Sequence, residues 1–250
     1  MEDLIKTEIN QNLKLYQKKE GLTFTSDAYL LYAYMKKRPD LTAADFGSGT
    51  GVISLLCASK RKYSTNHACE IQKEFCDIIC KNIIENNLDE YIKVHNINVS
   101  ELSKYSFGKE IDVVFSNPPY MKSQSGKAND SMLKNIARHE IHGTIYDFCK
   151  SANNVLKHGG YFYCVYRPDR LCDLFVAMRN SNLEPKRVTF VHSRANLGPC
   201  LVLVEAKKGA GASLIVTKPL IMYNDDLTYT DDLKFIYENG EFNEQYKKSR

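Results

Sequence analysis

Four consecutive residues, Asn117, Pro118, Pro119 and Tyr120, could hold a nucleobase for chemistry at an amino group. They follow residues 111–116, an apolar run with the composition of a buried strand. Proline fixes φ and lacks an N–H group, so the Pro118 carbonyl is left facing outward. This carbonyl and the Asn117 side-chain oxygen could accept both N–H groups of an exocyclic amine such as adenine N6. Tyr120 offers a flat face on which an extruded base can stack.

A glycine-rich turn lies upstream of this motif. Asp45 ends a predicted strand, and Gly47, Gly49 and Gly51 follow it at the start of a predicted helix. Glycine permits positive φ and a close approach by a ligand, and a helix start presents free N–H groups to a carboxylate. Glu70 ends the next strand, where it could accept hydrogen bonds from both hydroxyls of a ribose. The turn alone does not distinguish S-adenosylmethionine from NAD.

The two motifs together are more specific than either alone. The carboxyl ends of parallel strands meet at one edge of an open α/β sheet, where such folds bind ligands. An amine held by two acceptors can take a methyl group in an in-line displacement that depends on positioning and preorganised dipoles. Asn-Pro and Pro-Pro are also common where strands simply end, so the motif has a purely structural alternative. Its place downstream of the glycine turn favours methyl transfer.

Strands alternate with helices from Leu41 onwards, which is typical of a parallel sheet covered on both faces. The expected strands are Ala43–Phe46, His67–Ile71, Ile92–Ile97, Ile111–Ser116, Gly160–Tyr166, Pro185–His192 and Cys200–Glu205. The expected helices are Val52–Lys60, Lys73–Asn87, Ile145–Leu156 and Asp169–Asn182. No helix separates the last two strands, so they should form an antiparallel hairpin at the sheet edge. The predicted fold is therefore α/β, a seven-stranded, mostly parallel sheet with an antiparallel edge hairpin.

The segment before the main domain predicts a short hairpin and a helix. Leu13–Tyr16 and Leu22–Phe24 are the expected hairpin strands, and Ser26 with Asp27 begins an apolar helix that runs to Met35. A long polar region without periodicity, residues 121–138, is expected to be a functional loop. The predicted organisation is an N-terminal hairpin and helix at 1–40, a methyltransferase domain at 41–207 and a C-terminal tail at 208–250.

The composition is that of an ordinary globular protein, with 43% hydrophobic and 26% charged residues. No apolar run approaches the roughly 20 residues that span a bilayer, and the polar first ten residues do not resemble a secretory signal. A cytoplasmic location without a membrane partner is therefore expected. The eight cysteines include no C-x-x-C pair, so free thiols are expected and no metal site. A net charge of +4 with recurring basic clusters favours a nucleic-acid partner.

At these motifs the chain resembles the class I Rossmann-like N6-adenine methyltransferases, and within them the bacterial tRNA(Val) adenosine-37 N6-methyltransferase family. The resemblance includes features that the general class lacks, namely Phe24-Thr25-Ser26-Asp27-Ala28, Ala137-Arg138-His139-Glu140 and Arg167-Pro168-Asp169-Arg170-Leu171. It implies S-adenosyl-L-methionine as the cofactor and an adenosine in a tRNA anticodon loop as the substrate.

The resemblance also implies which residues act. The cofactor would be bound by Thr25, Asp27, Asp45, Gly47, Gly49, Gly51, Glu70 and Asn98, and the catalytic residues would be Asn117, Pro118 and Tyr120. Many relatives place an aspartate at the position of Asn98, where it accepts a hydrogen bond from the amino group of the cofactor's adenine. The side-chain oxygen of Asn98 could accept the same bond.

Other functions stay open at this point. Ribosomal-RNA adenine N6-methyltransferases share both motifs. Protein-glutamine methyltransferases use the same Asn-Pro-Pro-Tyr chemistry but carry a helical domain ahead of the glycine turn, for which the 44 residues before Asp45 are too few. A DNA adenine methyltransferase usually needs an added recognition domain. From other classes come an NAD-dependent oxidoreductase and a non-catalytic RNA-binding module. The sequence does not indicate the oligomeric state.

Overall fold

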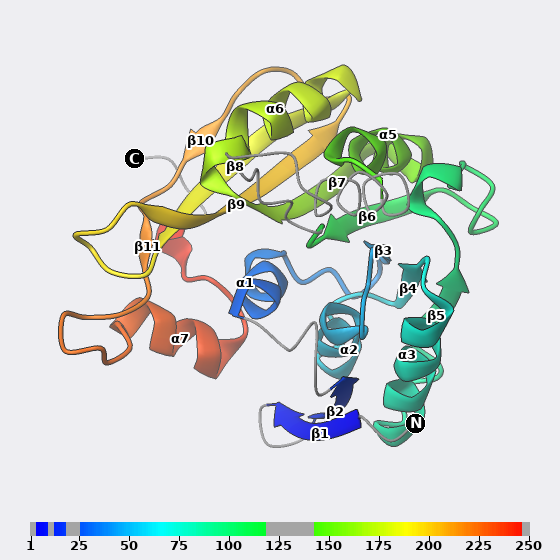
Figure 1. Cartoon of the computed structure of the whole chain (residues 1–250). Coiled ribbons are helices and arrows are strands. Elements are labelled where there is room, and N and C mark those ends of the chain that lie inside the picture. The colour runs from blue at the N-terminus through cyan, green and yellow to red at the C-terminus, as the bar shows by residue number, and fades with distance from the viewer. Residues whose placement is uncertain (1–3, 10–12, 19–25, 119–142, 247–250) are drawn as a thin grey trace, which may run out of the picture.

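The structure, a computed structural model, describes residues 4–9, 13–18, 26–118 and 143–246. A mixed sheet forms the centre of the molecule, with helices on both of its faces, and a two-stranded hairpin lies apart from it (Figure 1). Within the described residues, no helix is both long and apolar enough to cross a membrane.

The sheet contains five parallel strands and an antiparallel pair in the order β8-β9-β7-β6-β3-β4-β5. The parallel strands are β3 (Thr42–Phe46), β4 (Thr65–Glu70), β5 (Ile92–Asn96), β6 (Ile111–Ser116) and β7 (Leu156–Tyr166). The antiparallel pair is β8 (Leu183–His192) and β9 (Pro199–Lys208). Because β9 is also antiparallel to β7, β8 runs in the direction of the parallel strands. These seven strands confirm the predicted sheet.

The edge of the sheet differs from the prediction. Two two-residue strands, β10 (Ile215–Val216) and β11 (Leu220–Ile221), pair in parallel with the outer side of β8. The sheet therefore has nine strands among the described residues, and the β8–β9 hairpin does not form its outermost edge. The outer edge of β8 offers unpaired N–H and C=O groups, which the C-terminal segment satisfies. Strands this short have no periodicity that a sequence pattern could reveal.

The helices divide into two layers. One face of the sheet is covered by α5 (Ile145–Val155) and α6 (Leu171–Asn180), whose apolar side chains form one core cluster. The other face is covered by α1 (Ser26–Tyr34), α2 (Val52–Ser59), α3 (Lys73–Glu85) and α7 (Asp231–Asn239), which contribute to the second cluster (Figure 1). Burial on both faces explains why most residues of β3 and β6 are apolar and do not alternate strictly with polar ones.

The N-terminal hairpin forms with a partner that the sequence did not predict. Strand β2 (Leu13–Lys18) pairs antiparallel with β1 (Leu4–Ile9), whereas the predicted partner, residues 22–24, lies outside the described residues. Alternate residues of β2 are buried, and Leu15 is fully enclosed in the core cluster that includes α2 and α3. The hairpin is thus packed onto the helical layer.

The C-terminal segment folds back over α1. Leu233 and Ile236 of α7 are buried in the cluster of α1, and the Tyr29 hydroxyl donates to the Tyr237 carbonyl at 3.1 Å. The guanidinium of Arg187 donates to the Tyr246 carbonyl at 3.2 Å, from within a buried ion pair with Glu205. Residues 208–246 therefore extend both the sheet and the helical layer.

Candidate functional site

Three of the predicted site residues lie at the carboxyl edge of three neighbouring strands. Asp45 lies on β3 beside Ala68 of β4 and Phe115 of β6. Glu70 is the last residue of β4, and Asn117 directly follows β6. The parallel register therefore brings together segments that are far apart in the sequence, as the strand-end argument predicts.

The glycine turn is fastened to the end of β4 by its own backbone. The N–H groups of Gly47 and Ser48 both donate to the Cys69 carbonyl, at 2.9 and 3.0 Å. The N–H of Gly49 donates to Glu70 Oε2 at 2.9 Å, and that of Gly51 donates to the Ser48 carbonyl at 2.8 Å. These bonds within the chain fix the shape of the turn, which lowers the entropic cost of binding a ligand.

The three glycines have different structural reasons. All have positive φ, at 69° for Gly47, 55° for Gly49 and 81° for Gly51. A Cβ on Gly51 would lie 3.0 Å from Ile79 of α3, so helix packing excludes a side chain there. A Cβ on Gly49 would have nothing within 4 Å among the described residues. Gly49 thus presents bare backbone to open space, which suits the close approach of a ligand.

Asp45 has an unused hydrogen-bonding atom next to this turn. It is buried, and Ser54 Oγ donates to its Oδ2 at 2.8 Å. Among the described residues, no group donates to its buried Oδ1. Burial raises the pKa of the carboxyl to about 7, the Ser54 hydrogen bonds oppose this and the nearby Glu70 charge adds to it. Oδ1 could accept a hydrogen bond from a cationic amino group, as S-adenosylmethionine carries, so Asp45 fits the predicted cofactor.

Glu70 makes structural hydrogen bonds in addition to its predicted contact with the ribose. Its Oε2 holds Gly49, and its Oε1 accepts the N–H of Gln72 at 2.9 Å. An ionised carboxylate has about four lone-pair sites, so two remain for the hydroxyls of a ribose. Its predicted role is therefore compatible with its structural one.

Asn98 has a role that the sequence argument missed. Its Oδ1 caps a short 3-10 helix, Val99–Glu101, by accepting from the N–H and hydroxyl of Ser100 at 3.0 and 2.9 Å. Both lone pairs of the oxygen are thereby engaged. Asparagine is a preferred residue at the N-cap of a helix, and this preference was a signal that the sequence offered. A hydrogen bond from adenine to this oxygen stays a prediction and would have to displace Ser100.

Ser116 positions the end of β6, and sequence reasoning also missed it. Its fully buried hydroxyl donates to the Phe46 carbonyl at 2.8 Å. This bond joins the ends of β6 and β3 directly before the Asn-Pro-Pro-Tyr motif and the glycine turn begin. Asn117 is half-buried and Pro118 buried, so both start beside the glycine turn.

The start of α5 forms a wall against the same turn. Thr144 and Asp147 make reciprocal capping bonds between side chain and backbone, which fix the first turn of the helix. The Phe148 ring then lies where a Cβ on Gly47 would be 3.5 Å from it. The chain thus returns from the segment after Asn117 to pack on the glycine turn.

The remaining predicted site residues are Asp27, Thr25 and Tyr120. Asp27 is half-buried in the first turn of α1. Burial raises the pKa of the Cys200 thiol, and the nearby Asp27 carboxylate raises it further. The start of α1 therefore lies near the start of β9. Thr25 and Tyr120 lie outside the described residues, as do the 121–138 region and the 137–140 motif. Their predicted roles stay predictions.

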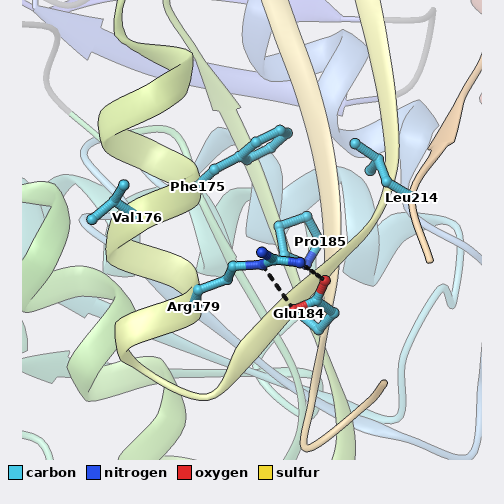
Figure 2. Close-up of a pocket in the computed structure, with 6 residues that line it drawn as sticks. All are labelled: Phe175, Val176, Arg179, Glu184, Pro185 and Leu214. Atoms are coloured by element: carbon cyan, nitrogen blue, oxygen red, sulfur yellow. Dashed lines mark hydrogen bonds and ion pairs between the residues drawn. The ribbon is translucent and has the colours of Figure 1, made fainter. Parts of the chain in front are cut away.

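A pocket of about 350 Å³ lies elsewhere, between α6, the start of β8 and Leu214 (Figure 2). Phe175, Val176 and Pro185 line it with apolar surface. Its polar groups, Arg179 and Glu184, are already paired with each other by two hydrogen bonds. Because β8 runs parallel to β7, this pocket lies at the amino edge of the sheet, away from Asn117.

The strand order, the glycine turn and the acidic residue after the second parallel strand define a class I S-adenosylmethionine-dependent methyltransferase fold. A family model, the methyltransferase small domain, matches residues 24–173, and the chain belongs to this family. The predicted fold class, enzyme class and cofactor are thereby confirmed.

Individual relatives agree with this assignment. The chain is 30% identical over 176 residues to the tRNA1(Val) (adenine(37)-N6)-methyltransferase of Pedobacter heparinus, covering 70% of this chain and 73% of that protein. It is 26% identical over 172 residues to the enzyme of the same name from Pseudoalteromonas translucida, covering 69% and 71%. A crystal structure of a predicted O-methyltransferase, protein Atu636 from Agrobacterium tumefaciens, matches with a TM-score of 0.69 at 21% identity, covering 87% of this chain and 98% of that one. This last likeness concerns the fold.

Proposed function

We propose that this enzyme transfers a methyl group from S-adenosylmethionine to the N6 amino group of an adenosine in tRNA, at position 37 of a valine tRNA. The observation that carries the chemistry is the position of Asn117 and Pro118, which begin beside the glycine turn because Ser116 ties β6 to β3. Relatives at 26–30% identity that carry the name of this activity support the substrate. Such a substrate is met in the cytoplasm.

The cofactor half of the site is built from backbone and buried carboxylates. Bound S-adenosylmethionine would supply an electrophilic methyl group on a sulfonium. The N–H groups at the start of α2 would bind its carboxylate, since the first N–H groups of a helix have no intrahelical acceptor. Asp45 Oδ1 would accept from its amino group, and the two remaining sites on Glu70 would accept from its ribose. Each contact fixes the orientation of the methyl group relative to Asn117.

The substrate half acts by orienting the amine. The Asn117 side-chain oxygen and the Pro118 carbonyl would each accept one N–H of N6. Adenine N6 is a weak nucleophile because its lone pair is delocalised into the ring, and holding both N–H groups favours the tetrahedral nitrogen that attacks. A base in an anticodon loop is already unpaired, so exposing it costs less than extracting it from a duplex.

The decisive experiment compares tRNA from cells with and without the gene. Mass spectrometry of nuclease-digested valine tRNA should show N6-methyladenosine at position 37 only when the gene is present. Purified protein with labelled S-adenosylmethionine should then restore the mark to tRNA from the deletion strain. Loss of N6-methyladenosine from ribosomal RNA with tRNA unchanged would retain the chemistry and overturn the substrate.

A further inference from the structure

The side chains of Asn82, on α3, and Asn86, the C-cap residue of α3, pair with the outer edge of β2 as a neighbouring strand would. Asn86 Oδ1 accepts the N–H of Lys14 at 2.9 Å, and its Nδ2 donates to the Lys14 carbonyl at 2.7 Å. One helical turn earlier, Asn82 makes the same two bonds with Tyr16, at 2.6 and 3.0 Å. The spacings match, because residues two apart on a strand and four apart on a helix face the same way. The two asparagines therefore hold the hairpin on α3.

Asn82 differs from Asn86 in its third bond. Its Nδ2 also donates to the Thr50 carbonyl at 3.1 Å, inside the glycine turn. The corresponding bond of Asn86 goes to the Asn82 carbonyl on its own helix, at 2.7 Å. Both N–H groups of the Asn82 amide are thus used, and a flipped amide would face two carbonyls with its oxygen. The Asn82 side chain, which is fully buried, is therefore held in one orientation.

The Thr50 carbonyl belongs to the peptide that joins the glycine turn to α2. A peptide unit is planar, so directing this carbonyl toward α3 directs the Gly51 N–H to the opposite side. There the N–H donates to the Ser48 carbonyl at 2.8 Å. Gly51 is also the N-cap of α2. The orientation of one peptide thus sets how the first N–H groups of α2 lie relative to Gly49.

We propose that Asn82 is a positioning residue for cofactor binding, through which the docked β1–β2 hairpin holds the glycine turn in its binding shape. This inference rests on the proposed role of the glycine turn toward S-adenosylmethionine. Ile79 lies three residues before Asn82 on α3. It packs against Gly51 and so supports the glycine turn from the same side. The hairpin, which precedes every motif of the site in the sequence, is thereby linked to the glycine turn by hydrogen bonds through one buried amide.

Asn82→Ala and Asn86→Ala form a matched pair of variants in the full-length enzyme. Each removes three hydrogen bonds, two of them to β2, but only Asn82→Ala removes the bond to Thr50. Calorimetric titration with S-adenosylhomocysteine should show Kd raised about three- to tenfold in Asn82→Ala, the factor that one lost hydrogen bond supplies. The KM for S-adenosylmethionine should rise with it while the KM for RNA is unchanged. Asn86→Ala, at a half-buried position, should change Kd less than about twofold although it removes the corresponding two bonds to β2.

The outcomes distinguish the positioning role of Asn82 from the proposed cofactor site on which it rests. An unchanged Kd in Asn82→Ala, or an equal rise in both variants, would overturn the positioning role. A wild-type enzyme that does not bind S-adenosylhomocysteine would overturn the cofactor site itself. If circular dichroism shows that Asn82→Ala is unfolded, Asn82→Ser takes its place under the same criteria, because a hydroxyl leaves less empty space and cannot reach both carbonyls.

Discussion

The carboxyl edge of the sheet and the pocket at its amino edge differ in the state of their polar groups. In the pocket beside α6, Arg179 and Glu184 satisfy each other and the remaining lining is apolar (Figure 2). At the carboxyl edge, Asp45 and Glu70 are both buried; no described group donates to Asp45 Oδ1, and each Glu70 oxygen accepts one hydrogen bond and so retains a lone pair. Burying a polar group without a full set of partners costs free energy, so such groups mark places where a ligand completes the set. The unused Oδ1 of Asp45 beside the glycine turn therefore favours a ligand at the carboxyl edge, whereas the polar groups of the pocket are paired with each other.

The largest effect should come from Asn117→Ala. Loss of one preorganised acceptor typically lowers the rate by about 10²–10³, because it acts most strongly in the transition state. Single-turnover methylation of tRNA should show this fall in rate, while the Kd for S-adenosylhomocysteine stays within about twofold. A parallel loss of cofactor affinity would mean that Asn117 acts by shaping the turn.

Glu70→Ala should weaken cofactor binding by about 10- to 100-fold, the range for hydrogen bonds to a charged acceptor. Glu70→Gln retains one acceptor oxygen and should cost less. Calorimetry on both variants measures the difference. Equal affinities for wild type and Glu70→Ala would remove Glu70 from the cofactor site and leave only its bonds to Gly49 and Gln72.

Asp45 should make the free energy of unfolding depend on pH. Its pKa rises from 3.8 to about 7 on folding, so the folded chain favours the protonated carboxyl. The stability gained in this way is complete below about pH 4 and is lost as the pH rises through 7. Relative to Asp45→Asn, the wild-type free energy of unfolding should therefore fall between these values, by at most about 1.4 kcal/mol per pH unit. Urea titrations at several pH values would measure it, and parallel curves would contradict the assignment.

The smallest effect should follow changes in the pocket. Val176→Ser and Leu214→Ser alter side chains that are 49% and 42% exposed, so stability should change little. We expect kcat and both KM values to stay within about twofold of wild type. A larger loss of activity would show that this hollow, and not only the carboxyl edge, takes part in the reaction.

Local sequence patterns predicted much of the sheet and of its connections. Ile111–Ser116 and Ala43–Phe46 are rich in apolar residues without strict alternation because parallel strands are buried on both faces, and such runs are visible in a single sequence. The approach of Asp45, Glu70 and Asn117 to one edge follows from strand direction alone. The residues of the site could therefore be named before their contacts were known.

Other features depended on contacts between distant segments. The strands β10 and β11 are two residues long and exist only because β8 offers an open edge. Asn82 reaches Tyr16 and Thr50, which lie 66 and 32 residues away in the chain. The raised pKa of Asp45 comes from burial, which no local pattern measures. The sequence by itself determined the fold class and the approach of Asp45, Glu70 and Asn117 to one edge of the sheet, because local periodicity and strand direction encode them. Only the tertiary structure decided which side chains hold the glycine turn, because hydrogen-bond partners are chosen by packing.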